Sequence, residues 1–431
     1  MKLEEIKSKI ILKDDIYYFD WTASGLGYED IEDEIKEVLQ TYANTHSDCA
    51  SCAKITSDYY ENARNGLKRL LNLNDDFYLI PCGFGSTAAI KLFQEIMGIY
   101  ISPITKKALN LDISKLNLPF VAVSPYEHHS NEISYKNGLC EIYRTPLKDD
   151  YIDWESLNST LLKVRNQDQN RQIILSFSAA SNVTGIKTDL LKLRQISRKF
   201  NAIIALDVSS LVAYENVDCD FFDVAFISSH KLLGGVGGCG LLAIRKNLCK
   251  FDEPIFAGGG VIQYASRTSV RYFDDFERLM DAGTPPITQL IRAYLAFRLR
   301  NDFGLDKIAK IERENLEYFA TKLSQIPNLI CYCPPNLERI AIFAFNIDGI
   351  SPYDLAKSLS DNFGVQVRAG CSCAGPYGHD LLGLEDDLSF VLKPGWVRAS
   401  IHYTHSKDDL DYLITAIKTA AKLLQTAPNL S

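Results

Sequence analysis

Six short apolar runs, separated by segments with helical periodicity, constrain the fold of this chain more than any other feature. The runs cover residues 77–81, 120–124, 173–177, 202–207, 224–228 and 240–245. Because each run is apolar along most of its length rather than alternating with polar residues, we expect strands that are covered on both faces. Helical patterns at 87–99 and 188–200 lie between the runs. The sequence therefore predicts an α/β fold with a mostly parallel sheet enclosed by helices.

The pattern changes after residue 285. Residues 286–325 have helical periodicity, 340–346 reads as a strand, and 352–363 reads as a further helix. With 431 residues the chain is long enough for two domains. We expect a large domain over 26–290 and a smaller α+β C-terminal domain over 291–431, with the N-terminal segment 1–25 packing against the small domain.

Charge and hydropathy exclude several classes of protein. The formal net charge is -8, from 46 basic and 54 acidic side chains, which disfavours non-specific nucleic-acid binding. The charged N-terminus has no apolar signal segment, and no apolar stretch approaches the length of a membrane span. We therefore expect a cytoplasmic protein that binds neither nucleic acid nor membrane.

Eleven cysteines are an odd number, and in a long chain without export signals they do not indicate a disulfide framework. Cys49 and Cys52 form a C-x-x-C pair, but a structural zinc site needs a second pair at matching spacing. We expect no metal site, and we expect most of the cysteines to be small buried hydrophobic residues.

Polar residues follow the predicted strands at the points where the strands end. Ser86 and Thr87, preceded by glycines, begin a helix after the first run, where backbone N–H groups can bind a phosphate. His128 follows the second run, where an imidazole can stack on a flat ring, and Asn182 follows the third. Each also has a structural reading, because serine caps helices and histidine is common in loops. Ligands of such sheets bind at the carboxyl ends of the strands, so we expect these residues to lie together.

A lysine and an aspartate give the strongest indication of what the site binds. Lys231 follows the apolar run 224–228 almost directly and precedes a glycine-rich loop. A desolvated lysine amine is what Schiff-base chemistry with an aldehyde requires. Asp207 ends a neighbouring apolar run, where a carboxylate is costly to bury unless it meets a cation such as a protonated pyridine nitrogen. Together these residues predict pyridoxal 5′-phosphate (PLP) attached to Lys231.

At this point the sequence resembles a known family, the class V, fold-type I PLP enzymes, which include cysteine desulfurases, selenocysteine lyases and related aminotransferases. The resemblance extends from Phe19 to about Thr404. Its landmarks are short motifs: Gly85-Ser86-Thr87, Glu127-His128-His129, Ser181-Asn182, Asp207, Ser228-Ser229-His230-Lys231, Ala282-Gly283-Thr284-Pro285 and Arg368-Ala369-Gly370-Cys371-Ser372-Cys373-Ala374.

The resemblance implies a role for each matching position. The residues expected around the cofactor ring are Lys231, Asp207, His128 and Asn182. Those expected at its phosphate are Ser86, Thr87, Ser228 and His230, with Thr284 reaching the phosphate of the partner subunit in a homodimer. Arg398 matches the arginine that binds the substrate α-carboxylate, and Cys373 matches the sulfur-accepting cysteine. The resemblance places Ser210 near the cofactor's phenolic oxygen, where desulfurases usually carry glutamine.

Two functions remain open on the sequence. The first is a cysteine desulfurase-like reaction on a small amino-acid substrate, in which L-cysteine gives L-alanine and a persulfide on Cys373, with a sulfur-acceptor protein as the next partner. The second is a class V aminotransferase or β-eliminating lyase in which Cys373 is not catalytic. For Cys373 itself, packing of a tight turn and a metal site with His379 are the alternatives to a nucleophile.

Overall fold

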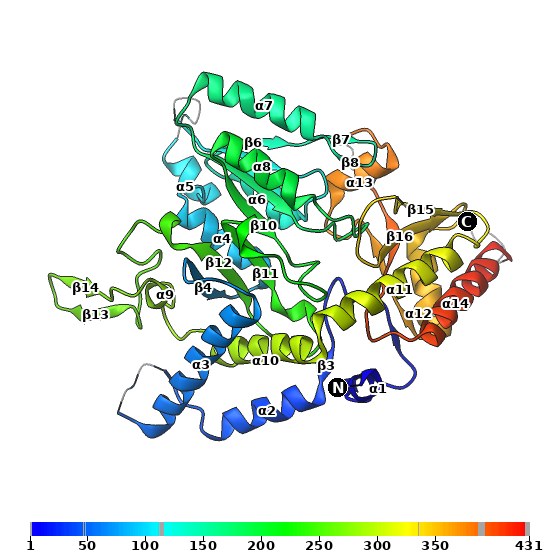
Figure 1. Ribbon diagram of the computed structural model, residues 1–431, viewed down its shortest axis with the longest axis horizontal. Coiled ribbons are helices and arrows are strands. Elements are labelled where there is room, and N and C mark those ends of the chain that lie inside the picture. Colours follow the sequence, from blue (N-terminus) through cyan, green and yellow to red (C-terminus); the bar gives the residue numbers. More distant parts are fainter. Residues whose placement is uncertain are drawn as a thin grey trace.

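A seven-stranded mixed sheet forms the centre of the larger part of the molecule (Figure 1). The computed structural model describes residues 2–45, 47, 49–110, 112, 116–334, 336–386 and 393–426. Among these residues the strand order is β4 (Phe77–Cys82), β12 (Gly240–Arg245), β11 (Val224–Ser228), β10 (Ile203–Asp207), β9 (Ile173–Ser178), β5 (Phe120–Val123) and β6 (Glu141–Arg144). Only β12 runs against its neighbours, while the pairs from β11 to β6 are parallel. The predicted α/β fold with a mostly parallel sheet is confirmed.

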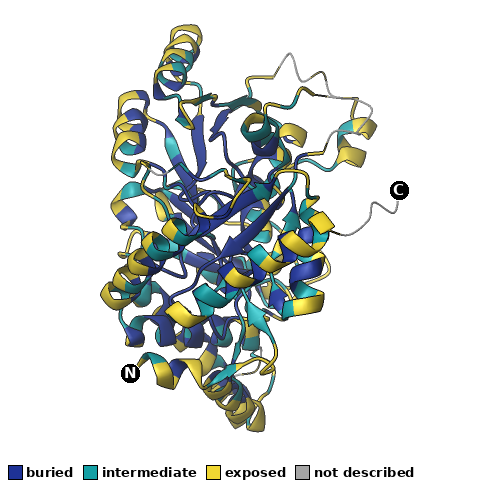
Figure 2. Cartoon of the chain, turned by 90° about the vertical axis from the view of Figure 1, so that its right-hand side faces the viewer, coloured by how far each residue is buried: buried dark blue, intermediate teal, exposed yellow. Residues whose placement is uncertain are grey.

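Helices cover both faces of this sheet, which explains why its central strands are mostly apolar. Successive residues of β12 belong to different cores: Leu241 lies in one hydrophobic cluster and Leu242 in the other. One face packs against α4 (Gly85–Ile96) and α6 (His129–Asn137). The other packs against α3 (Ser51–Leu70), α7 (Trp154–Gln167), α8 (Leu190–Phe200) and α10 (Ile287–Phe303). Figure 2 shows the buried interior enclosed by helices whose outer surfaces are exposed.

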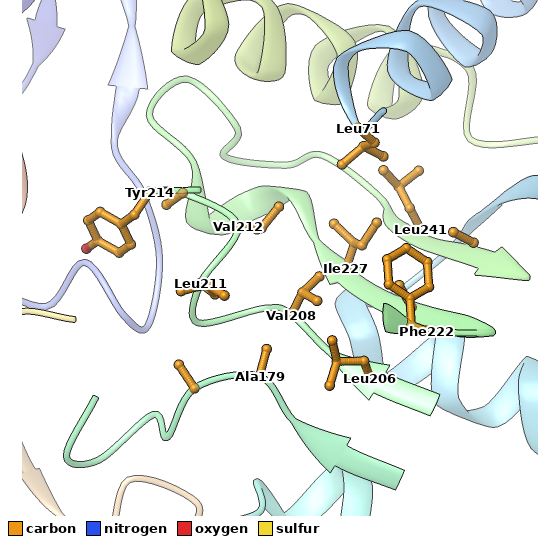
Figure 3. Close-up of a cluster of buried hydrophobic side chains, with 14 of the residues drawn as sticks. Leu71, Ala179, Leu206, Val208, Leu211, Val212, Tyr214, Phe222, Ile227 and Leu241 are labelled. Atoms are coloured by element: carbon orange, nitrogen blue, oxygen red, sulfur yellow. The ribbon is translucent and has the colours of Figure 1, made fainter. Parts of the chain in front are cut away.

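A cluster of buried side chains supports the carboxyl ends of β10 and β11 (Figure 3). Leu206, Val208 and Ile227 belong to the same hydrophobic core as Leu241 and Phe222 and are 6% exposed or less. Burying one such side chain contributes about 1.5–3 kcal/mol. The cluster therefore holds in place the backbone that carries Asp207 and the residues after β11.

A second, four-stranded antiparallel sheet lies in the C-terminal part. Its strand order is β15 (Leu329–Cys331), β16 (Ile342–Ile347), β19 (Trp396–Ser400) and β18 (Arg368–Gly370) among the described residues. Three helices share its hydrophobic core, namely α11 (Leu305–Leu323), α12 (Pro352–Phe363) and α14 (Lys407–Thr426). Gly304, at a φ of 104°, separates α10 from α11 and divides the predicted helical stretch in two.

The N-terminal segment contacts this second sheet. Strand β2 (Tyr17–Tyr18) pairs in parallel with β17 (Val365–Gln366), and Asp20 forms a parallel bridge with Ser400. Phe19 lies in the core of the second sheet. The exact domain limits, 1–25, 26–290 and 291–431, stay a prediction.

The remaining helices and strands lie outside the two main sheets. They are α1 (Leu3–Lys7), β1 (Ile10–Ile11), β3 (Gly27–Tyr28), α2 (Glu29–Gln40), α5 (Pro103–Ala108), β7 (Leu147–Lys148), β8 (Tyr151–Ile152), β13 (Ile262–Ala265), β14 (Val270–Tyr272), α9 (Phe276–Leu279) and α13 (Gly375–Leu382). The β13–β14 hairpin projects from the body of the molecule (Figure 1). None of the helices in the described ranges is long and apolar enough to cross a membrane.

The cysteines correct one prediction. All eleven are free, but only Cys82, Cys219, Cys239 and Cys333 are buried. Cys49 is exposed just before the helix α3, and Cys52 is exposed in its first turn. Cys331 is exposed on the edge strand β15. The expectation that most cysteines are buried was wrong, because composition does not reveal which side of an element faces solvent.

Candidate active site

A cavity of about 220 Å³ opens at the carboxyl ends of the parallel strands. Its lining comes from three parts of the chain: the loops after β4, β5, β9, β10 and β11, the N-terminal residues Thr22 and Ala23, and the second sheet with its loop. The predicted site residues that line it are Ser86, Thr87, His128, Asn182, Asp207, Ser210, Ser228, His230, Lys231, Cys373 and Arg398. The structure therefore brings these residues to one site.

The N-terminus of α4 forms one end of the cavity. The N-cap residue Phe84 provides no side-chain cap, and the Ser86 N–H in the first turn donates to Ser228 Oγ at 3.0 Å. Gly85 has a φ of +58°, and a Cβ there would lie 2.9 Å from His230 Cε1. Glycine is therefore required both by the left-handed backbone and by the close approach of the imidazole. The helix N-terminus and these donors can bind a phosphate.

Lys231 and Asp207 lie at the ends of the two adjacent strands β11 and β10. Lys231 ends a short 3₁₀ turn, Ser229–Lys231, directly after β11. Burial lowers the pKa of Lys231 to about 8, and Arg398 adds to this shift while Asp207 opposes it. Asp207 is 6% exposed and accepts a hydrogen bond from the Ser209 N–H at 3.0 Å. The site thus holds an amine that loses its proton far more readily than an ordinary lysine.

His128 is held as a neutral imidazole. It caps α6, because its Nδ1 accepts a hydrogen bond from the Ser130 N–H at 3.1 Å. Burial, together with the charge of Lys231, lowers the pKa of His128 to about 3. The preceding residue, Glu127, is buried and accepts hydrogen bonds from Ser178 N at 2.7 Å and Ser178 Oγ at 2.6 Å. These contacts fasten the His128 loop to the end of β9.

Asn182 connects the large sheet to the loop that contains Cys373. Its side-chain Nδ2 donates to the backbone carbonyl oxygen of Ser372 at 2.7 Å. Its backbone carbonyl oxygen accepts from Arg398 Nη1 at 2.9 Å. Its Oδ1 is buried and has no hydrogen-bond partner within the described part of the chain. An orphaned acceptor beside the cavity is suited to a donor on a bound ligand.

Cys373 lies in a strained turn. The Ala374 N–H donates to the Cys371 carbonyl oxygen at 3.0 Å, and Ser372 and Cys373 have φ angles of 53° and 58°. Two consecutive positive φ values usually select asparagine or glycine, and the left-handed conformation costs other residues about 1–2 kcal/mol each. The His129 N–H holds the turn through the Cys373 carbonyl oxygen at 2.8 Å. Strain of this kind is concentrated at functional sites.

The sulfur of Cys373 lies among cationic groups. A negative charge on it would raise the pKa of Lys231, Arg368 and Arg398. Its side chain is exposed and lines the cavity. These observations favour an accessible thiol over the alternative that Cys373 only packs a turn.

Arg398 comes from β19 and is 2% exposed. Its Nη2 donates to Asp20 Oδ1 at 2.8 Å. Asp20 also binds Arg368, whose Nε lies 3.0 Å and whose Nη2 lies 2.9 Å from Asp20 Oδ2. Asp20 was not among the predicted site residues. Its place at the start of the family resemblance was the one signal in the sequence that pointed to it.

Thr284 does not line the cavity of its own chain. It is exposed, and its Oγ1 accepts from Asn44 Nδ2 at 3.0 Å. Its expected role concerns a second copy of the chain and stays a prediction.

The residues present fit PLP. The uncapped helix N-terminus with Ser228 suits a phosphate, Asp207 suits a protonated ring nitrogen, and the Lys231 amine suits an aldehyde. A neutral His128 suits the face of an aromatic ring.

The sheet order, the second antiparallel sheet and this arrangement of residues define a fold-type I PLP enzyme fold. A model of the family described as "Aminotransferase class-V" matches residues 17–413. The chain therefore belongs to the aminotransferase class-V family and is a cysteine desulfurase-like member of it.

Individual relatives agree with this placement. The chain is 27% identical over 410 residues to a probable cysteine desulfurase of Staphylococcus aureus (strain Mu50), covering 93% of this chain and 91% of the relative. A probable cysteine desulfurase of Staphylococcus epidermidis (strain RP62A) is 26% identical over 412 residues, with the same coverage of 93% and 91%.

Solved structures share the fold. A cysteine desulfurase from Thermococcus onnurineus in its apo form superposes with a TM-score of 0.82 at 22% identity, covering 98% of this chain and 99% of that one. The cysteine desulfurase CsdA from Escherichia coli superposes with a TM-score of 0.77 at 21% identity, again covering 98% and 99%.

Proposed function

We propose that the protein binds PLP on Lys231 and acts as a cysteine desulfurase-like lyase and sulfurtransferase. The observation that carries the proposal is the position of the exposed Cys373 in the same cavity as Lys231, Asp207 and Arg398. A scaffold without catalysis would not need a lysine with a pKa near 8 facing a buried carboxylate. The names of the relatives support the choice of L-cysteine as substrate.

Three side chains of the site have separate roles in the proposed reaction. Arg398 binds the substrate α-carboxylate, and Asp207 holds the charge of the ring nitrogen. The bound cofactor supplies an electron sink for the bonds at the substrate α-carbon. The Lys231 amine accepts and returns a proton, as its lowered pKa allows near neutral pH.

Cys373 accepts the sulfur. Its thiolate attacks the substrate thiol sulfur, so that an S–S bond forms and the bond between the substrate sulfur and its β-carbon breaks. The electron pair of that bond moves to the substrate carbon, which takes up a proton to become L-alanine. The products are L-alanine and a persulfide on Cys373, from which a sulfur-acceptor protein removes the sulfur.

The test compares wild type with Cys373→Ser, supplied with L-cysteine and a reducing thiol. We expect wild type to form L-alanine and sulfide in equal amounts, and the variant to lose both while keeping its cofactor absorbance. Cys140→Ser is a matched control, since Cys140 is half-buried and does not line the cavity. Unchanged alanine formation in Cys373→Ser would contradict the proposal.

One observation favours the second candidate, an aminotransferase or β-eliminating lyase. Ser210 lines the cavity where desulfurases usually carry glutamine. Pyruvate and ammonia from L-cysteine, or an amino group appearing on a keto acid, would identify this reaction in place of the first.

We also propose a homodimer in which Thr284 completes the phosphate site of the neighbouring copy. An interface of this kind is isologous, so both sites are completed at once. If light scattering shows that the fully active protein is a monomer, this proposal is wrong. As a separate point, we propose that the protein is located in the cytoplasm.

A further inference from the structure

The carboxylate of Asp20 lies between the two guanidinium groups of the cavity. Its Oδ1 accepts from Arg398 Nη2 at 2.8 Å, and its Oδ2 accepts from Arg368 Nε at 3.0 Å. Asp20 is 9% exposed, and the side chain of Arg398 is 3% exposed. Arg368 Nε also lies 3.3 Å from Oδ1, so one buried carboxylate binds both arginines.

The N-terminal segment places Asp20 there by packing on the second sheet. Asp20 bridges to Ser400, and the neighbouring Thr22 Oγ1 lies 2.7 Å from Ser400 Oγ. Arg398, two residues before Ser400, and Arg368 are partners in the register of β18 and β19. The backbones of the three charged residues are thus held by strand pairing, while the Arg398 side chain is buried and the Arg368 side chain is 44% exposed.

This arrangement determines the charge that a substrate meets. Arg398 and Arg368 contribute two positive charges and Asp20 one negative charge, which leaves one net positive charge at this end of the cavity. One α-carboxylate balances that charge. Arg368 is already bound by Asp20 and is therefore not free to bind a second carboxylate, such as the side chain of an acidic amino acid. That second carboxylate would also be repelled by the negative charge of Asp20.

We propose that Asp20 is a specificity-determining residue, which makes the site select amino acids with a single carboxylate and a neutral side chain over acidic amino acids. This inference rests on the proposed function, because it assigns Arg398 to the substrate α-carboxylate. It places L-cysteine within the accepted class and excludes L-aspartate. Asp20 acts by holding and neutralising the arginines and is a positioning residue.

The test measures binding rather than turnover. Dissociation constants of L-alanine and L-aspartate are measured by calorimetry on the cofactor-loaded protein, for wild type, Asp20→Asn, Arg368→Gln and the double variant. Wild type should prefer L-alanine. Asp20→Asn, which leaves two uncompensated arginines, should shift the ratio of the two constants towards L-aspartate at least tenfold.

The other variants test the charge balance. Adding Arg368→Gln to Asp20→Asn restores one net positive charge and should restore the preference for L-alanine. Arg368→Gln alone should strengthen discrimination against L-aspartate, and this variant leaves Asp20 in place if Asp20→Asn does not fold.

Asp223→Asn is the matched control. Asp223 is also a carboxylate shared by two arginines, with Arg194 Nη1 at 3.3 Å and Arg245 Nε at 3.1 Å, and it does not line the cavity. Its loss should change stability but not the ratio of the two ligands.

The inference would be overturned by a wild type that binds L-aspartate as tightly as L-alanine, or by a ratio of the two constants that is the same in Asp20→Asn as in wild type. A wild type that binds neither amino acid would also overturn it. Failure of the proposed function gives a different result, in which L-cysteine yields no L-alanine while the binding ratios shift as expected.

Discussion

The reactivity of Lys231 can be tested through the pH dependence of cofactor attachment to the apo protein. Attachment requires the neutral amine. With a pKa of about 8, roughly a tenth of the amine is neutral at pH 7, against about 0.03% for an ordinary lysine at 10.5. The neutral fraction of Lys231 at pH 7 is therefore about 300 times that of an unperturbed lysine, and the attachment rate should level off above pH 8.

The direction in which Asp207 shifts the pKa of Lys231 provides a second test. Asp207 raises the pKa of Lys231 and so opposes the effect of burial. Asp207→Asn should therefore move the midpoint of the rate profile below that of wild type, although the cofactor itself should bind more weakly.

The assay follows PLP absorbance after mixing with apo protein between pH 6.5 and 9.5, with Nα-acetyllysine as the reference amine. Borohydride reduction and peptide mapping then locate the label. A midpoint near 10.5, or a label on another lysine, would refute the argument. A midpoint that rises in Asp207→Asn would show that the carboxylate does not act on this amine.

Three further predictions concern other parts of the site and its support. Gly85→Ala places a Cβ at a φ of +58° and 2.9 Å from His230, so PLP affinity should fall by at least tenfold in a binding titration, and unchanged affinity would argue against this phosphate site. Asn182→Ala removes the 2.7 Å hydrogen bond to Ser372 and should slow sulfur transfer to Cys373 more than it weakens cofactor binding; equal losses in single-turnover kinetics would count against a role in positioning the loop. Leu206→Ala should lower the free energy of unfolding by about 2–5 kcal/mol in urea titrations, because Leu206 is fully buried in the cluster under the site (Figure 3), and a loss below 1 kcal/mol would show that this core is not closely packed.

Much of the central sheet follows from the local sequence. The predicted runs 173–177, 224–228 and 240–245 match β9, β11 and β12 to within a residue, because strands covered on both faces are apolar along most of their length. β6 (Glu141–Arg144) was not predicted: it is an edge strand with no fully buried residue, so it lacks that apolar signature. The reversed direction of β12 also could not be predicted, since an apolar run does not record which way its neighbours run.

The same division applies to the site. Asp207 and Lys231 follow two apolar strands, and the convergence of parallel strand ends is a general rule, so the sequence alone was sufficient to bring them together. Asp20, Arg368 and Arg398 meet only because the N-terminal segment and the strands β18 and β19 pair across more than 340 residues of chain. No local periodicity encodes such contacts, because they depend on how two separately formed cores pack against each other. The sequence by itself thus determined which residues meet at the carboxyl end of the large sheet, whereas the tertiary structure decided that Asp20, Arg368 and Arg398 lie together beside the cavity.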